Sequence, residues 1–202
     1  MEDFSVFEMM LFTLWIYLPG FLVNTFAMMW GKWLPKTGYG PWPIDGGRLH
    51  KDGNRLLGDG KTWNGLIGGS LTSGLLCYLM TMVPENWIFI SPTEAATGWA
   101  ASAFVLGTFL GFTSLVGDST GSYFKRRKGM KREGDVSSKA PLLDTLPFAI
   151  SVFLFGQLFL TGSNHGDREL LVPMILLVVI TPILHRSFNL IGYKIGWKHV
   201  PY

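Results

Sequence analysis

The sequence is poor in the residues that build disulfides and zinc sites. It has one cysteine, Cys77, so no disulfide can form within the chain. Its four histidines are far apart and lack the spacing of zinc ligands: His50, His165, His185 and His199. It contains no nucleic-acid-binding module. These absences argue against a zinc enzyme and a nucleic-acid partner.

Charge is also scarce, at 15% of 202 residues, and it is absent from long stretches. Uncharged runs cover residues 9–30, 65–83, 95–117 and 145–164, and each approaches the ~20 helical residues that cross a bilayer. A fifth run, 170–184, reaches that length if its helix continues past Arg186, whose side chain can extend to the headgroups. The sequence therefore predicts an all-α integral membrane protein, a single domain over 1–202 with five transmembrane helices near 6–30, 65–84, 95–117, 145–163 and 170–190.

Basic residues are distributed very unevenly between the two sets of connecting segments. Segments 31–64, 118–144 and 185–202 hold 16 of the 17 Lys and Arg, and Arg168 alone falls in the other set. Because cytoplasmic loops of membrane proteins are enriched in Lys and Arg, these three segments are predicted to be cytoplasmic. The N-terminus is then outside, the C-terminus is cytoplasmic, and 31–64 and 118–144 form two long cytoplasmic loops.

The first of these loops, 31–64, is rich in glycine and in basic residues. It contains eight Gly, three Pro, three Asp and six Lys or Arg. Glycines let several backbone N–H groups converge on an anion, and the cations neutralise it, so this composition suits phosphate binding. A solvated loop that is basic because of topology alone is an equal alternative. The segment GDGKT at 58–62 is not a P-loop, because Arg55 stands where that motif needs glycine.

Two residues of the first span are unusual for a membrane helix. Pro19 removes a helix hydrogen bond, and Asn24 is costly facing lipid, so both are expected to face the interior of the bundle. A kink with an interhelical hydrogen bond is the favoured interpretation. The alternative is that Asn24 lines a polar substrate cavity.

The end of the third span carries a polar stripe. If its helix continues, Asp118, Ser122, Lys125 and Arg126 share one side, at i, i+4 and i+7 or i+8. A carboxylate can hold Mg²⁺, and fixed cations can stabilise charge on a leaving pyrophosphate. The alternative is a helix end whose basic residues meet anionic membrane lipids, which does not explain Asp118.

Asp144 stands at the start of the fourth span and has two interpretations of equal weight. It could be the N-cap of that helix. It could also approach Asp118, because two carboxylates at one end of a bundle make a site for a hard cation such as Mg²⁺.

Two motifs give the chain a resemblance to the archaeal CDP-archaeol synthases, membrane relatives of the CDP-diacylglycerol synthases. The first is PIDGGRLHKDGNRLLGDGKTWNGLIGG at 43–69, and the second is GDSTGSYFKRR at 117–127 with the later LLDTL at 142–146. The resemblance covers nearly the whole chain, including the five-span pattern and Asn24. It implies a cytidylyltransferase that joins CTP to a glycerol phosphate carrying two ether-linked geranylgeranyl chains, with Mg²⁺ required.

The resemblance also suggests roles for individual residues. Asp118 and Asp144 would bind the metal, and Lys125 and Arg126 would complete the catalytic set. The CTP-binding set would comprise Asn24, Asp45, Lys61, Thr62 and Ser122. One departure from the family pattern is Pro147, where the wider family has a second aspartate.

Two other classes of protein remain possible from the residues alone. A transporter or channel is one, because polar residues and prolines within spans also occur there. The acids lie at the cytoplasmic rim and not at the midplane, which argues against it. A non-catalytic membrane scaffold is the other.

Overall fold

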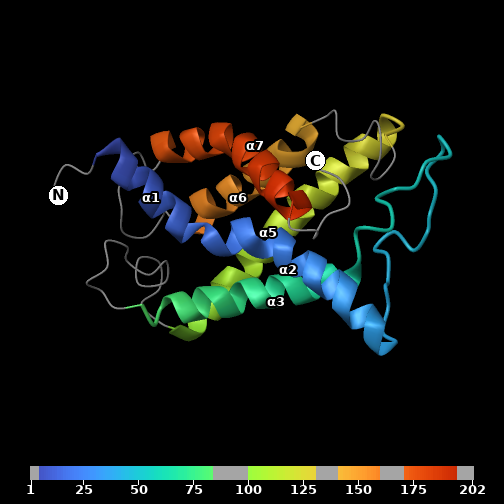
Figure 1. Cartoon of the computed structure of the whole chain (residues 1–202), viewed down its shortest axis with the longest axis horizontal. Coiled ribbons are helices and arrows are strands. Elements are labelled where there is room, and N and C mark those ends of the chain that lie inside the picture. The colour runs from blue at the N-terminus through green and yellow to red at the C-terminus, as the bar shows by residue number, and fades with distance from the viewer. Residues whose placement is uncertain (1–4, 84–99, 131–140, 160–170, 195–202) are drawn as a thin grey trace.

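The computed structural model describes residues 5–83, 100–130, 141–159 and 171–194, and these ranges are mostly helical (Figure 1). The α-helices are α1 (Val6–Ile16), α2 (Leu18–Trp33), α3 (Trp63–Met80), α5 (Ala100–Arg127), α6 (Pro141–Phe159) and α7 (Leu171–Lys194). A short 3-10 helix, η1 (Leu34–Thr37), follows α2. Pairing of extended backbone in the described ranges is limited to two isolated bridges, Pro43 with Thr62 and Leu49 with Arg55. The predicted helical fold class is confirmed.

The first predicted span consists of two helices, α1 and α2, separated at Tyr17. Pro19, at the start of α2, has no N–H to donate to the preceding turn, which accounts for the break. Pro19 is fully buried, and its carbonyl oxygen accepts a hydrogen bond from Ser73 Oγ at 2.8 Å. The interruption at Pro19 therefore faces the bundle, as the sequence predicted.

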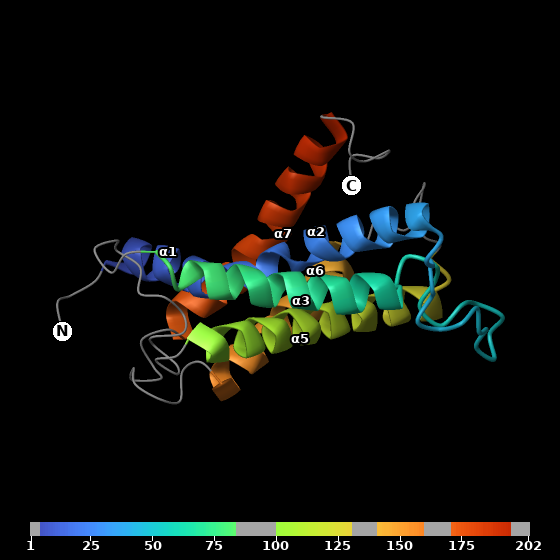
Figure 2. The ribbon, with the colours of Figure 1, turned by 90° about the horizontal axis from the view of Figure 1, so that it is seen from below.

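Glycines allow the central helices to pack at very short range. A Cβ on Gly74 of α3 would lie 2.6 Å from the Phe104 carbonyl oxygen of α5, and one on Gly121 of α5 would lie 2.5 Å from the Leu143 carbonyl oxygen of α6. Small residues at such contacts are typical of helices that pack in membranes. Figure 2 shows α3 and α5 side by side over most of their length, with α6 behind them and α7 projecting from the bundle.

Apolar side chains cover much of the outer surface of the bundle. On α3, Ile67, Leu71, Leu75 and Leu79 form an exposed stripe at every fourth position. Within the described ranges, Thr13–Thr37 and Ala103–Arg127 are long and apolar enough to cross a membrane. The count of five spans and the direction in which the chain crosses the bilayer stay predictions.

Two helix boundaries bear on the candidate site. α5 continues ten residues past the predicted span end, to Arg127, so the polar stripe from Asp118 onward lies on a helix as expected. α6 begins at Pro141, because proline at a first helical position gives up no hydrogen bond. Asp144 therefore lies inside the first turn of α6, and its predicted role as N-cap is wrong.

Candidate functional site

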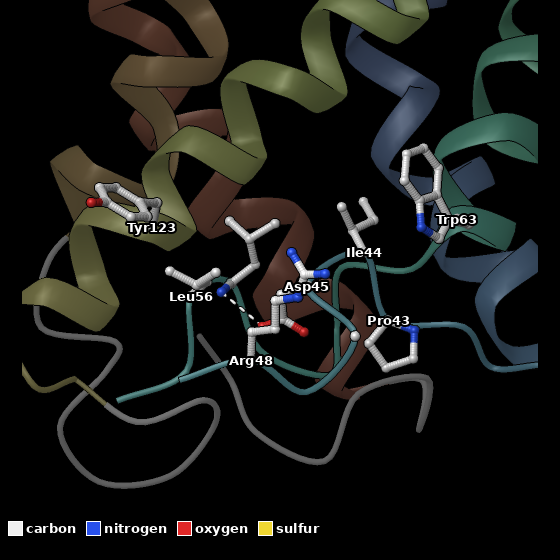
Figure 3. A pocket seen from close by; sticks show the side chains of 9 residues that line it. Pro43, Ile44, Asp45, Arg48, Leu56, Trp63 and Tyr123 are labelled. Carbon is white, nitrogen blue, oxygen red and sulfur yellow. Dashed lines mark hydrogen bonds between the residues drawn. The ribbon is translucent and has the colours of Figure 1, made fainter. Parts of the chain in front are cut away.

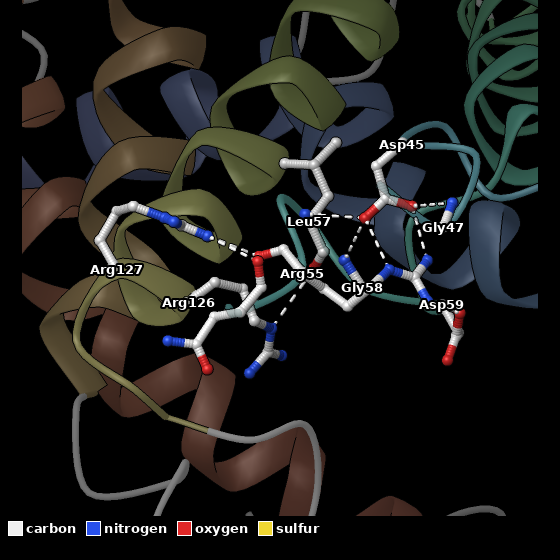
Figure 4. A network of polar contacts seen from close by, with 9 residues as sticks. Asp45, Gly47, Arg55, Leu57, Gly58, Asp59, Arg126 and Arg127 are labelled. Atoms are coloured by element: carbon white, nitrogen blue, oxygen red, sulfur yellow. Dashed lines mark hydrogen bonds and ion pairs between the residues drawn. The ribbon is translucent and has the colours of Figure 1, made fainter. Parts of the chain in front are cut away.

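The loop between η1 and α3 is organised around the carboxylate of Asp45. Its Oδ1 accepts hydrogen bonds from Arg55 Nη2 at 2.6 Å and from the Gly47 backbone N–H at 3.1 Å. Its Oδ2 accepts from Arg55 Nε at 3.2 Å and from the backbone N–H groups of Leu57 and Gly58, both at 3.0 Å (Figure 4). The Asp45 side chain is 1% exposed. One acid thus ties together both ends of the 45–58 segment.

The surroundings of Asp45 stabilise its charged form. Burial alone would raise the pKa of the Asp45 carboxyl, but the Arg55 guanidinium and the three backbone N–H groups outweigh burial and hold that pKa well below its usual range. The carboxylate is therefore ionised at neutral pH. Since it already accepts five hydrogen bonds, its main effect is on the shape of the loop.

The C-terminal part of the loop leads directly into α3. Thr62 is the N-cap of this helix, and its hydroxyl oxygen accepts a hydrogen bond from the Gly65 N–H at 3.1 Å. Backbone hydrogen bonds from Ile44 N to Lys61 O and from Trp63 N to Trp42 O pair the two ends of the loop. Lys61 and Thr62 are consequently held at the base of the loop, beside the N-terminus of α3.

Lys61 and Asp118 form an ion pair between the loop and α5. Their side chains are 22% and 20% exposed, so the pair remains open to solvent on one side. The two residues are 57 positions apart in sequence. The fold therefore brings together a cation from the first predicted loop and the leading acid of the polar stripe.

The rest of the stripe continues along the last turns of α5. Ser122 is buried at 5% exposure, and Lys125 and Arg126 are partly buried. Arg126 Nε approaches the Leu57 carbonyl oxygen at 3.5 Å, and the Arg126 side chain lies against Gly58. Arg126 thus contacts the same loop segment that Asp45 organises.

Two other helices contact α5 near this region, α6 through Leu143 and α2 through Gly20. Leu143, the neighbour of Asp144, has its carbonyl oxygen against Gly121 of α5, but the Asp144 side chain lies outside the described part of the structure. Asn24 is half-buried on α2. One turn earlier Gly20 packs against Ser114 of α5, and because α2 and α5 run in the same direction, the next turn brings Asn24 level with Asp118.

A pocket of about 480 Å³ opens between the loop and α5 (Figure 3). Its lining combines apolar and aromatic side chains with one acid and one base: Pro43, Ile44, Asp45, Gly46, Arg48, Leu56, Leu57, Trp63 and Tyr123. Pockets of this size and mixed lining are typical of small-molecule sites. Trp63, Arg48 and Tyr123 carried no signal in the sequence beyond their place in the two motifs.

The described residues can also be tested against the expected metal. They contain no group of three or more His, Cys, Asp or Glu that could enclose an ion. Mg²⁺, however, is commonly held by only one or two carboxylates together with substrate phosphates. Asp118 offers one partly exposed carboxylate, and the contact of Gly121 with Leu143 places the first turn of α6, which carries Asp144, against the same helix, α5. The donor set therefore fits a magnesium ion that is shared with a polyphosphate.

In the described part of the chain, the fold and the site define a mostly helical protein with an apolar bundle and a polar, phosphate-suited site at one end. The model of the CarS-like family, described as CDP-archaeol synthase, matches residues 6–202, and the chain belongs to this family. The CDP-archaeol synthase of Thermococcus gammatolerans is 36% identical over 193 residues, which cover 96% of each chain. That of Methanosarcina barkeri is 36% identical over 197 residues, covering 92% of this chain and 99% of the relative.

A solved structure shares the fold. It is described as an intramembrane enzyme for archaeal membrane lipid biosynthesis, and it matches with a TM-score of 0.65 and 26% identity over 89% of this chain and 94% of that one. The resemblance inferred from the two motifs is therefore confirmed at the level of the family.

Proposed function

We propose that this protein forms unsaturated CDP-archaeol and pyrophosphate from CTP and 2,3-bis-O-geranylgeranylglycerol 1-phosphate. Membership of the CDP-archaeol synthase family supports the reaction. The proposed location of the site rests on the Lys61–Asp118 ion pair, which joins the glycine-rich loop to the polar end of α5. The matched relatives are synthases, which favours an enzyme over the transporter and scaffold alternatives.

The proposed reaction is a single displacement at phosphorus. A phosphate oxygen of the lipid attacks the α-phosphorus of CTP, a new P–O bond forms, and the bond to the β-phosphate breaks as pyrophosphate leaves. Lys61, Lys125 and Arg126 would bind the β- and γ-phosphates and stabilise the charge that develops on the leaving group. Magnesium, held by Asp118 and Asp144, would supply further neutralisation of the phosphate oxygens. The chain contributes positioning and electrostatics, and no covalent enzyme intermediate is needed.

The 480 Å³ pocket is the proposed place for the nucleoside part of CTP. Its rim carries Trp63 and Tyr123, whose rings offer flat apolar surfaces to a base. Trp63 directly follows Thr62 and Lys61, so a base in this pocket would leave its phosphates near the Lys61–Asp118 pair. The helix N-terminus of α3 lies on the same side and favours an anion.

The protein is proposed to be a multi-pass membrane enzyme with this site on the cytoplasmic side. CTP is a cytoplasmic metabolite, and 16 of the 17 Lys and Arg fall in the segments predicted to face the cytoplasm. The apolar surface of the bundle would keep the isoprenoid chains of the lipid in the membrane while its phosphate reaches the site.

The deciding experiment uses the purified protein in detergent or lipid vesicles, with labelled CTP, the geranylgeranyl ether lipid phosphate and Mg²⁺. Formation of a CDP-lipid and of pyrophosphate in equal amounts is expected. Asp118→Asn should lower kcat by about 100-fold or more, because the metal and Lys61 lose their carboxylate. The control is Asp59→Asn, which neutralises an exposed carboxylate of the same loop and should retain activity. Absence of CDP-lipid with the unaltered protein would refute the proposed function.

A further inference from the structure

The tip of the first loop is a small hairpin, residues 48–56. Its ends are joined by hydrogen bonds from Leu56 N to Arg48 O at 3.1 Å and from His50 N to Asn54 O at 2.8 Å. Gly53 takes a positive φ of 76° at the turn, which a residue with a side chain rarely adopts. Asp52 accepts a hydrogen bond from Asn54 N at 3.0 Å. A two-stranded hairpin is at best marginally stable in water by itself, so contacts with the rest of the protein must hold this one in place.

Arg127, the last residue of α5, supplies such contacts. Its Nη1 donates to Asp52 Oδ1 at 2.7 Å, and its Nη2 donates to the carbonyl oxygens of Arg55 at 2.6 Å and Asn54 at 3.4 Å. The guanidinium also lies 5.2 Å from the centre of the Tyr123 ring. The Arg127 side chain is 16% exposed, so it is well shielded from water for a residue of a helix end.

These contacts connect α5 to the pocket through a short chain of bonds. Arg127 binds the backbone of Arg55, and the Arg55 side chain binds Asp45, which lines the pocket (Figure 4). On the other side Arg127 lies against Tyr123, which lines the same pocket. Arg127 therefore contacts the pocket wall formed by α5 directly, through Tyr123. It contacts the wall formed by the loop through Arg55, which binds Asp45.

We propose that Arg127 is a positioning residue that holds the loop against α5 and so sets the width of the pocket for the nucleotide. The role needs arginine. Two nitrogens of its planar guanidinium can donate to a carboxylate and to a carbonyl oxygen, and the face of the same group can pack against an aromatic ring. Lysine offers a single ammonium and can satisfy only part of this set. That the nucleotide is CTP rests on the proposed function. The contact between the loop and α5 is independent of that function.

Two kinds of measurement test the proposal on the full-length protein. Hydrogen exchange of residues 48–56 should quicken in Arg127→Ala, because the hairpin loses its link to α5. In the CTP assay the same variant should raise KM for CTP by about 30-fold and change kcat by less than about threefold, since binding geometry is lost and the phosphate ligands remain. Arg127→Lys should fall between Arg127→Ala and the unaltered protein.

The matched control is Lys128→Ala, which removes a neighbouring exposed cation from the same end of α5. It should leave both the exchange rates and KM unchanged, which separates the proposed role from general attraction of CTP to a basic surface. Asp52→Ala gives a second route from the loop side, and its effect on KM should be non-additive with that of Arg127→Ala.

Unchanged hydrogen exchange and KM in Arg127→Ala would overturn the proposal. So would a loss confined to kcat, because it would place Arg127 in the chemistry. Equal effects of Arg127→Ala and Lys128→Ala would overturn it as well. If Arg127→Ala fails to fold, Asp52→Ala alone must still quicken exchange of the hairpin and raise KM, or the proposal is refuted. If the unaltered protein makes no CDP-lipid, the proposed function fails, while the exchange measurement still decides whether Arg127 holds the loop.

Discussion

Asp45 and Asp118 are both acids of the candidate site, and their surroundings give them different capacities. Asp45 is enclosed and accepts five hydrogen bonds from Arg55 and from the loop backbone. Asp118 is one-fifth exposed and pairs with Lys61. A carboxylate whose lone pairs are already occupied has little left for a ligand, whereas an open one can exchange its partner. We therefore assign the shaping of the loop to Asp45 and the binding of charge to Asp118.

Replacing Asp45 by asparagine should loosen the loop while the bundle stays folded. The variant removes the enclosed charge to which Arg55 and three backbone N–H groups donate, while Arg55 keeps its pair with the exposed Asp59, and the free energy of opening the 45–58 segment should fall by about 2 kcal/mol. Hydrogen exchange of this segment at neutral pH measures that change. An unaltered exchange pattern would show that the Asp45 charge does not hold the loop.

The same carboxylate predicts a dependence of loop stability on pH. Because the pKa of Asp45 is lowered in the folded loop, its contribution is fully present above the pKa of an unfolded aspartate, near ~4, and is lost as the pH falls through the lower folded value. Proteolysis of the loop should therefore be constant from pH 8 to about 5 and increase only in stronger acid. In Asp45→Asn this acid-dependent increase should be smaller.

At the scale of elements, α5 combines two functions along one continuous helix. Glycines in its middle let α3 and α6 pack against it at very short range, and its last turns bring Asp118, Arg126 and Arg127 into contact with the loop. The position of the polar end therefore depends on the fit of the glycine contacts. A shift of α5 against α6 would move every site residue on that helix together.

Gly121→Ala tests this dependence. The new Cβ would lie 2.5 Å from the Leu143 carbonyl oxygen, so α5 and α6 must separate. We expect a loss of about 2 kcal/mol in stability from overpacking, seen as a lower Tm, together with lower cytidylyltransferase activity. Thr120→Ala, an exposed position one residue earlier, should leave both unchanged. A normal Tm and normal activity in Gly121→Ala would mean that the helices adjust without moving the site.

The elements were largely predictable from the sequence, whereas the loop was not. Uncharged runs located the helices, and the spacing of Asp118 and Ser122 predicted the helical extension of α5, because both signals come from local periodicity. The hydrogen bonds of Asp45 with Arg55 and of Arg127 with the hairpin join residues whose spacing in the sequence follows neither helical nor strand periodicity. The basic run at 125–128 gave no reason to distinguish Arg127 from its neighbours, since any of them could have faced solvent.

At the scale of the whole molecule, the described helices place Lys61, Asp118 and Arg127 at one end of the bundle. Met82, after the last residue of α3, lies at the opposite end of that helix from Lys61. The distribution of Lys and Arg predicts that the end with the site faces the cytoplasm.

Labelling of single cysteines with a membrane-impermeant reagent tests this orientation. The native Cys77 is buried and is first replaced by alanine. In this background, Lys51→Cys and Lys128→Cys should react only when the cytoplasmic side is accessible, and Met82→Cys only from outside. Reaction of Lys51→Cys and Met82→Cys from the same side would contradict the proposed crossing of α3.

The distance in sequence between the loop and its partners has a consequence for biosynthesis. Asp52 is made 75 residues before Arg127, and Lys61 is made 57 residues before Asp118. During translation the first loop therefore emerges without the contacts that hold its tip, and it still lacks them while α3 is being made. The Lys61–Asp118 pair and the contacts of Arg127 can form only when the last turn of α5 has left the ribosome. A nascent chain that stops before Asp118 has the first loop but no helix against which this loop can pack.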